Sequence, residues 1–120
     1  MNLSYKIVAC LIIALGIVHQ IFAACNDEFD LNVLWFLGSG FAIIFAGFLN
    51  VAFLRIEPKD ALVRALCIAT NSMVAALFAV AYFTVLDEPQ VIVGILLFAL
   101  GTVFSLLLKS KSQVVNSYDE

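Results

Sequence analysis

Four long apolar stretches alternate with three short polar segments along the chain. The stretches run from about residue 5 to 24, 32 to 54, 61 to 86 and 90 to 108. Each is close to the roughly 20 apolar residues that an α-helix needs to cross the hydrocarbon core of a bilayer. The pattern predicts an all-α membrane protein, a bundle of four transmembrane helices running up, down, up and down. A single domain would cover residues 1–111, and residues 112–120 would form a polar tail.

The polar segments contain signals that end one helix and begin the next. Pro58 cannot continue a helix and biases the residue before it towards extended backbone, so the second stretch should end near Arg55. Asp60 is placed to cap the amino end of the third stretch. The third polar segment contains Asp87, Glu88 and Pro89 and is expected to form a turn.

Composition narrows the class of protein further. Of 120 residues, 64% are hydrophobic and only 12% are charged, whereas soluble domains are about one quarter charged. Four spans with short loops leave no length for a separate soluble domain. The net charge of -3, with no basic patch outside the loops, gives no indication of nucleic-acid binding.

All the basic residues fall on one side of the predicted membrane. They are Lys6, Arg55, Lys59, Arg64, Lys109 and Lys111. The first and third loops contain carboxylates and no Lys or Arg. Because basic residues accumulate on the cytoplasmic side, both termini are expected inside and the acidic loops outside, in a multi-pass protein of the plasma (inner) membrane.

A secretory or lipoprotein signal is an alternative interpretation of the first stretch, with cleavage before Cys25. Lys6, the apolar residues after it and the sequence leading to Cys25 fit that pattern. Phe22 stands where such motifs have a smaller residue, and His19 and Gln20 interrupt the apolar core. We therefore favour an uncleaved first helix.

Small residues at helical spacing predict where the helices pack. Gly40 and Gly47 lie seven residues apart in the second stretch, and Gly94 and Gly101 do so in the fourth. The third stretch has small residues at intervals of three and four, namely Ala65, Ala69, Ser72, Ala76 and Ala79. Membrane helices associate where small residues let their backbones approach. A compact four-helix bundle is the expected result.

Three polar residues inside the spans are candidates for hydrogen bonds between helices. Asn71 and Ser72 lie near the middle of the third stretch, and Asn50 lies towards the cytoplasmic end of the second. Such groups cost free energy in lipid unless they are paired. A role in lining a substrate site is the alternative.

His19 is the single histidine, and it lies about a turn and a half inside the outer end of the first helix. One interpretation is a neutral ring that bonds to a neighbouring helix or to water. The other is a ligand-binding pocket that opens outward and includes Gln20, Trp35 and Asp30. An ionisable residue at membrane depth is a candidate functional group, and a histidine with a carboxylate can relay protons, hold a metal or recognise a head group.

The sequence predicts no metal site, no cofactor and no catalytic residues. One histidine with scattered carboxylates is not a ligand spacing, and haem would need a second axial ligand from a dimer or a methionine. Cys10 and Cys67 belong to the cytoplasmic halves of their spans and Cys25 to the outer mouth, so no pair within one chain lies on the oxidising side. A disulfide between two copies through Cys25 stays open.

The chain has four spans in 120 residues and the stretches from Gly16 to His19 and from Trp35 to Gly40. In this plan it resembles small DoxX-like proteins of the bacterial inner membrane. Some members of that group are associated with redox or respiratory partners. Small multidrug transporters share the size, but they carry a glutamate in the first helix, and residues 7–24 contain no carboxylate.

These observations favour a non-enzymatic accessory or interaction subunit. Its partners would be the lipid bilayer and either further copies of the chain or another membrane protein. The alternative is a small-ligand binder or transporter with an outward pocket around His19. A further alternative is a redox or cofactor protein that depends on His19.

Overall fold

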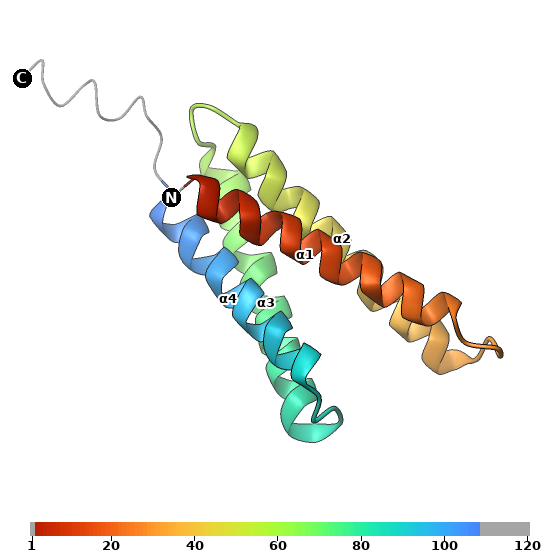
Figure 1. Ribbon diagram of the computed structural model, residues 1–120. Coiled ribbons are helices and arrows are strands. Elements are labelled where there is room, and N and C mark those ends of the chain that lie inside the picture. The colour runs from red at the N-terminus through yellow and green to blue at the C-terminus, as the bar shows by residue number, and fades with distance from the viewer. Residues whose placement is uncertain (1, 109–120) are drawn as a thin grey trace, which may run out of the picture.

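The computed structural model describes residues 2–108, and over this range it is all-helical. Four α-helices follow one another along the chain: α1 (Asn2–Ala24), α2 (Leu31–Arg55), α3 (Ala61–Thr84) and α4 (Pro89–Leu107) (Figure 1). Each of these helices is long enough and apolar enough to cross a membrane. The predicted polar tail at 112–120 lies outside the described residues.

Aspartates begin two of the helices. Asp30 Oδ1 accepts a hydrogen bond of 2.8 Å from the backbone N–H of Val33 at the start of α2. Asp60 Oδ1 does the same for Val63 at the start of α3, at 2.9 Å. Each bond satisfies one of the N–H groups that have no partner inside the helix. Pro89 begins α4, where its missing N–H costs nothing.

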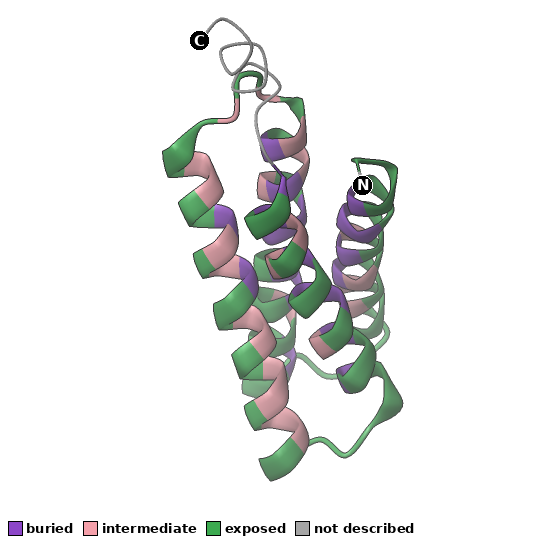
Figure 2. Cartoon of the chain, turned by 90° about the vertical axis from the view of Figure 1, so that its left-hand side faces the viewer, coloured by how far each residue is buried: buried purple, intermediate pink, exposed green. Residues whose placement is uncertain are grey.

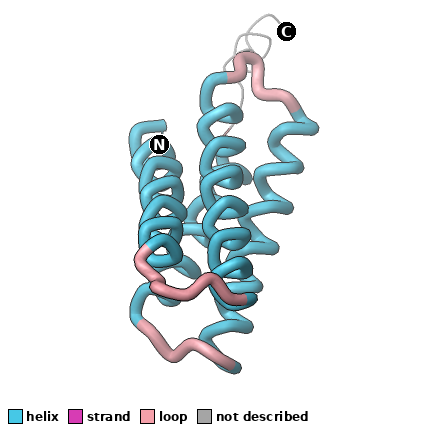
Figure 3. Tube along the Cα trace, turned by 90° about the vertical axis from the view of Figure 1, so that its right-hand side faces the viewer, coloured by secondary structure: helices cyan, strands magenta, loops and turns pink. Residues whose placement is uncertain are grey.

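The helices form two antiparallel hairpins, α1 with α2 and α3 with α4, and these are the most extensive helix contacts. Smaller contacts join α1 to α4 and α2 to α3. The hairpins meet at the end that holds the α2–α3 loop and diverge towards the opposite end (Figure 1). The α1–α2 and α3–α4 loops both lie at that opposite end (Figure 3). A bundle compact along its whole length is therefore the wrong description.

The two ends of the molecule differ in charge. The closed end carries Lys6, Arg55, Lys59 and Arg64, and we call it the basic end. The open end carries the carboxylates of residues 25–30 and 85–88, and we call it the acidic end. Among the described residues, no Lys or Arg lies at the acidic end.

Glycines allow α1 and α2 to approach closely. A Cβ added to Gly16 would lie 2.5 Å from Ile44 Cγ1 and 2.9 Å from the carbonyl oxygen of Gly40. Gly40 and Gly47, which the sequence predicted to pack, are buried against side chains of α1. The helices therefore touch at their backbones.

In the second hairpin, glycines of α4 make room for side chains of α3. The ring of Phe78 lies against Gly94, and the amide of Asn71 lies against Gly101. Gly94 and Gly101 are both buried, as expected for packing positions.

Of the five small residues predicted to pack on α3, four are exposed and Ala79 is half-buried, so the prediction was wrong for most of this face in the single chain. Ala65, Ala69, Ser72 and Ala76 are exposed, and α3 instead buries Cys67 and Asn71. Glycines on α4 leave room for larger side chains of α3. The face of α3 that carries Phe78 and Asn71 therefore turns towards α4. Figure 2 shows how much of every helix surface stays exposed.

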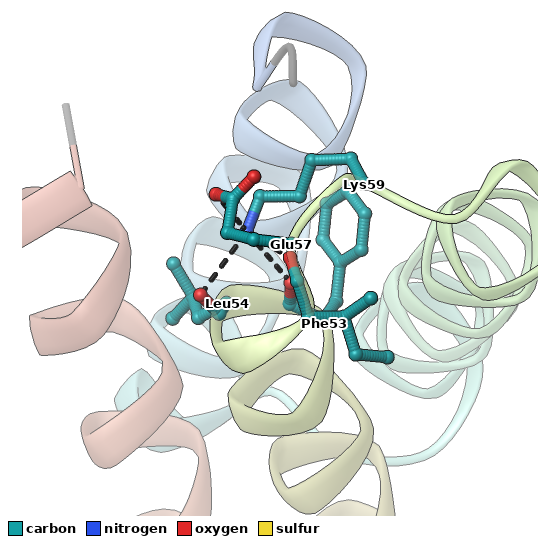
Figure 4. A network of polar contacts seen from close by, with 5 residues as sticks. Phe53, Leu54, Glu57 and Lys59 are labelled. Carbon is teal, nitrogen blue, oxygen red and sulfur yellow. Dashed lines mark hydrogen bonds and ion pairs between the residues drawn. The ribbon is translucent and has the colours of Figure 1, made fainter. Parts of the chain in front are cut away.

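Lys59 closes the basic end of α2. Its Nζ donates to the carbonyl oxygens of Phe53, Leu54 and Ile56 at 3.0, 3.1 and 2.9 Å. It also pairs with Glu57 at 3.1 Å and lies 5.4 Å from the centre of the Phe53 ring (Figure 4). The last carbonyls of a helix lack partners inside it, and a cation there also complements the helix dipole. The lysine side chain is only 5% exposed, so water screens these bonds little.

Replacement of Lys59 by methionine should lower the free energy of unfolding by about 1–3 kcal/mol, because carbonyls at the end of α2 would lose a charged donor. Denaturant titration in micelles, followed by circular dichroism, measures the change. Arg55→Met is the matched control, since Arg55 is exposed on the same turn; it should cost no more than about 1 kcal/mol, the helix-dipole contribution. Equal losses for the two variants would contradict the capping role.

Candidate functional site

A cavity of about 1230 Å³ occupies the space between the diverging hairpins at the acidic end. Its inner walls are apolar and come from three helices, with Leu15 and Val18 of α1, Ile43 of α2, and Leu77 and Phe78 of α3. Its mouth is polar. The groups there are Cys25, Asn26, Glu28, Asp30, Asn32, Glu88 and Gln90. The cavity thus combines an apolar interior with an acidic rim.

His19 lines this cavity and is half-buried. Its ring stacks on Phe36 of α2, with centroids 4.7 Å apart and planes 15° apart, and meets the edge of Phe78 of α3 at 6.4 Å. Nδ1 lies 3.0 Å from the carbonyl oxygen of Leu15. Because a carbonyl oxygen only accepts, Nδ1 carries a hydrogen. In the neutral ring, Nε2 is then an acceptor.

The acceptor Nε2 of His19 faces an accessible space. It has no hydrogen-bond partner among the described residues. Every buried side-chain nitrogen or oxygen in that part of the chain does have a partner, so an atom without one is not buried. Nε2 is therefore open to water or to a molecule in the cavity.

The residues that the sequence grouped with His19 separate in the structure. Asp30 reaches the mouth of the cavity, but one of its oxygens caps α2. Gln20 turns away and donates to the carbonyl oxygen of Leu37 at 2.9 Å, over Gly40. Trp35 is 69% exposed and lies outside the lining. Of the four candidates, only His19 and Asp30 share the cavity.

The neutral polar groups of the lining use donor atoms within the chain. Asn26 Nδ2 donates to the carbonyl oxygen of Phe22, Asn32 Nδ2 to Asp30, Ser39 Oγ to the carbonyl oxygen of Phe36, and Gln90 Nε2 to Glu88. The lining presents acceptors, namely the carboxylates of Glu28, Asp30 and Glu88 and, in its neutral ring, His19 Nε2, together with a second N–H on each of the three amides. None of the lining residues is a Lys or Arg.

A buried polar network ties the four helices together on the basic side of the cavity. It takes one fully buried residue from each helix, namely Tyr5, Asn50, Asn71 and Ser105. Tyr5 Oη donates to Asn50 Oδ1 at 2.6 Å and lies 2.7 Å from Ser105 Oγ. Asn50 and Asn71 exchange two amide hydrogen bonds, at 2.8 and 2.9 Å. Asn50 also donates to the carbonyl oxygen of Ala46, and Ser105 to that of Gly101.

Sequence reasoning found half of this network. Asn50 and Asn71 were expected to bond between helices, and they bond to each other. The third candidate, Ser72, is exposed, with Oγ 3.4 Å from Thr102 Oγ1 of α4. Tyr5 and Ser105 were missed as network members. A signal for Ser105 was its position four residues after Gly101, on the same face of the helix.

The side chains that could bind a metal, and the thiols, are dispersed over the described residues. No group of three or more His, Cys, Asp and Glu side chains there is placed to hold a metal ion. Cys67 is buried with Sγ 3.5 Å from the carbonyl oxygen of Leu49, whereas Cys10 and Cys25 are exposed. Cys25 belongs to the lining of the cavity mouth.

No family model, no curated protein and no solved structure matches the chain. The resemblance to DoxX-like proteins therefore stays a prediction. What the fold defines is the class, a multi-pass membrane protein with four apolar helices.

Proposed function

We propose that this chain binds a small, largely apolar molecule in the cavity at its acidic end. The observation that carries the proposal is the cavity itself, at about 1230 Å³ with apolar walls from three helices and a polar mouth. Ligand sites are typically concave, mostly apolar and furnished with a few polar groups. The cavity places such groups, His19 among them, at its wall and rim.

We further propose that the acidic end faces the outside of the plasma (inner) membrane and that the basic end faces the cytoplasm. All four basic residues of the described chain gather at one end, as the positive-inside rule requires of a cytoplasmic face. The cavity would then be reached from the outside.

Binding is favoured over transport by the basic half of the molecule. Tyr5, Asn50, Asn71 and Ser105 join all four helices there, and a second opening would have to break their hydrogen bonds. Alternating access needs a site that can open to either side.

A bulky residue in the cavity tests the proposal. Ala42 of α2 lines the cavity, and Ala76 of α3 is exposed elsewhere. Ala42→Trp should reduce occupancy of the site at least about tenfold, the effect of a steric cost near 1.4 kcal/mol. Native mass spectrometry of protein released from nanodiscs, prepared from its own host membrane, measures the bound molecule. Wild type and Ala76→Trp should both retain it. Equal occupancy in all three proteins, or none in wild type, would overturn the proposal.

An accessory role, with a partner on α3, is the second candidate. α3 buries only 11% of its most apolar stretch, against 28–33% in the other three helices. Its exposed face carries Ala65, Ala69, Ser72 and Ala76, the kind of residues that allow close helix contact. The same two variants separate the candidates: under this role, Ala76→Trp abolishes crosslinking to a partner in the membrane and Ala42→Trp does not.

A further inference from the structure

The polar groups of the cavity restrict the kind of molecule that fits it. We propose that the ligand is an amphipathic amine, bound in its protonated form. Its ammonium group lies among the carboxylates of the mouth, and its apolar body lies along the inner walls. This inference rests on the proposed function and adds the chemical class of the ligand.

Charge at the mouth is of one sign. Glu28, Asp30 and Glu88 belong to the lining, and Asp27 and Asp87 are their neighbours in the chain. All six Lys and Arg residues lie elsewhere in the sequence, and the four within the described residues are at the opposite end of the molecule. An anionic ligand would meet repulsion with no compensating base. A cation would meet charges of opposite sign, with attraction near 1 kcal/mol for each pair at about 4 Å in water.

The lining also contains hydrogen-bond acceptors for a donor ligand. Ser39 uses its one hydrogen within the chain, whereas the amides of Asn26, Asn32 and Gln90 each use one N–H there and keep a second. His19 Nδ1 is bound to the carbonyl oxygen of Leu15, so in the neutral ring Nε2 is an acceptor. A protonated amine supplies N–H donors and carries no acceptor, so it suits the carboxylates of the lining.

Aromatic rings in the lining also suit a ligand with a cationic group and an apolar body. Phe22 of α1, Phe36 of α2 and Phe78 of α3 all line the cavity, and the last two contact the His19 ring. The faces of such rings attract cations. They also give apolar surface for the body of the ligand.

The single histidine provides a reporter for the test. Protein labelled with ¹⁵N-histidine, in nanodiscs of zwitterionic lipid, is titrated with three probes of one shape: 1-naphthylmethylamine, 1-naphthylmethanol and 1-naphthoate. The amine should shift the His19 signals saturably and bind about tenfold more tightly than the alcohol, with naphthoate weaker still. Added salt should weaken amine binding and leave alcohol binding unchanged.

Substitutions of carboxylates at the mouth of the cavity test whether these groups bind the amine. Glu28→Gln combined with Glu88→Gln should reduce amine affinity to that of the alcohol, whereas Glu57→Gln, a change at the basic end, should leave both affinities unchanged. Should the double variant fail to fold, the salt dependence of the wild type decides the matter.

The outcomes separate the two proposals. Equal, saturable binding of amine and alcohol, or tighter binding of naphthoate, would overturn the amine and leave the cavity as a binding site. Failure of every probe to shift His19, or equal binding by Ala42→Trp, would overturn both.

Discussion

Replacement of Gly16 by leucine is expected to separate α1 from α2. Even one added carbon would lie 2.9 Å from the carbonyl oxygen of Gly40 and 3.0 Å from the backbone nitrogen of Ile44. Both are backbone atoms, so the contact is relieved only if the helices move apart. The cost should be about 3 kcal/mol or more, at the upper end of values for overpacked positions. Unfolding of the purified protein by rising sodium dodecyl sulfate in mixed micelles measures it.

Gly38 offers a control of the same chemistry. It lies in α2, and an added Cβ would meet no atom within 4 Å. Gly38→Leu should therefore leave stability unchanged or raise it by up to about 1 kcal/mol, since leucine favours the helix over glycine. A loss at Gly38 as large as the loss at Gly16 would show that close helix contact is not the cause.

Replacement of Asn50 by leucine is expected to be the most damaging single change in the polar network. Asn50 makes hydrogen bonds with Tyr5, Asn71 and Ala46. At about 0.6 kcal/mol for each bond in a membrane protein, four bonds sum to roughly 2.4 kcal/mol. The Asn71 amide would also be left buried without its partner, at about 1–3 kcal/mol for each unsatisfied group. Together these values predict a loss of about 3–5 kcal/mol in the free energy of unfolding.

A double-mutant cycle in the same micelle assay isolates the amide pair. Asn50→Leu with Asn71→Leu should cost clearly less than the sum of the single variants, because the double variant leaves neither amide of the pair buried without its partner. Asn32→Leu, on the exposed surface of α2, is the control and should stay within about 0.5 kcal/mol of wild type. Additive losses would mean that the two amides act independently.

The sequence predicts the elements of this fold well and their spatial arrangement only in part. The lengths of the apolar stretches predict the four helices, and Pro58 and Asp60 predict the boundary between α2 and α3. The divergence of the hairpins was not predictable, because it depends on which surfaces meet. Glycines of both hairpins mark close contacts, but nothing in the spacing of Ala65 to Ala79 says that this face of α3 stays uncovered.

Only part of the candidate site was predictable from the sequence, and that part is His19. His19 stands out as an ionisable group in an apolar helix, and it lines the cavity. Gln20 is its neighbour in sequence, but successive helix residues point about 100° apart, so Gln20 faces Gly40 instead. Leu77 and Phe78 come from a helix whose distance from α1 no local pattern encodes.

The hydroxyl groups of the polar network contain fewer hydrogens than they have contacts. Three oxygen-to-oxygen contacts join Asn50, Tyr5, Ser105 and the carbonyl of Gly101, and only Tyr5 and Ser105 supply a hydrogen. With the tyrosine hydrogen on Asn50, the serine hydrogen has two acceptors and reaches either by rotation of one bond. Only the pattern in which the serine hydrogen points to Tyr5 ties α1 to α4 here, because a bond from Ser105 to Gly101 lies within α4. The exchange needs the rotation of one hydroxyl and no backbone movement.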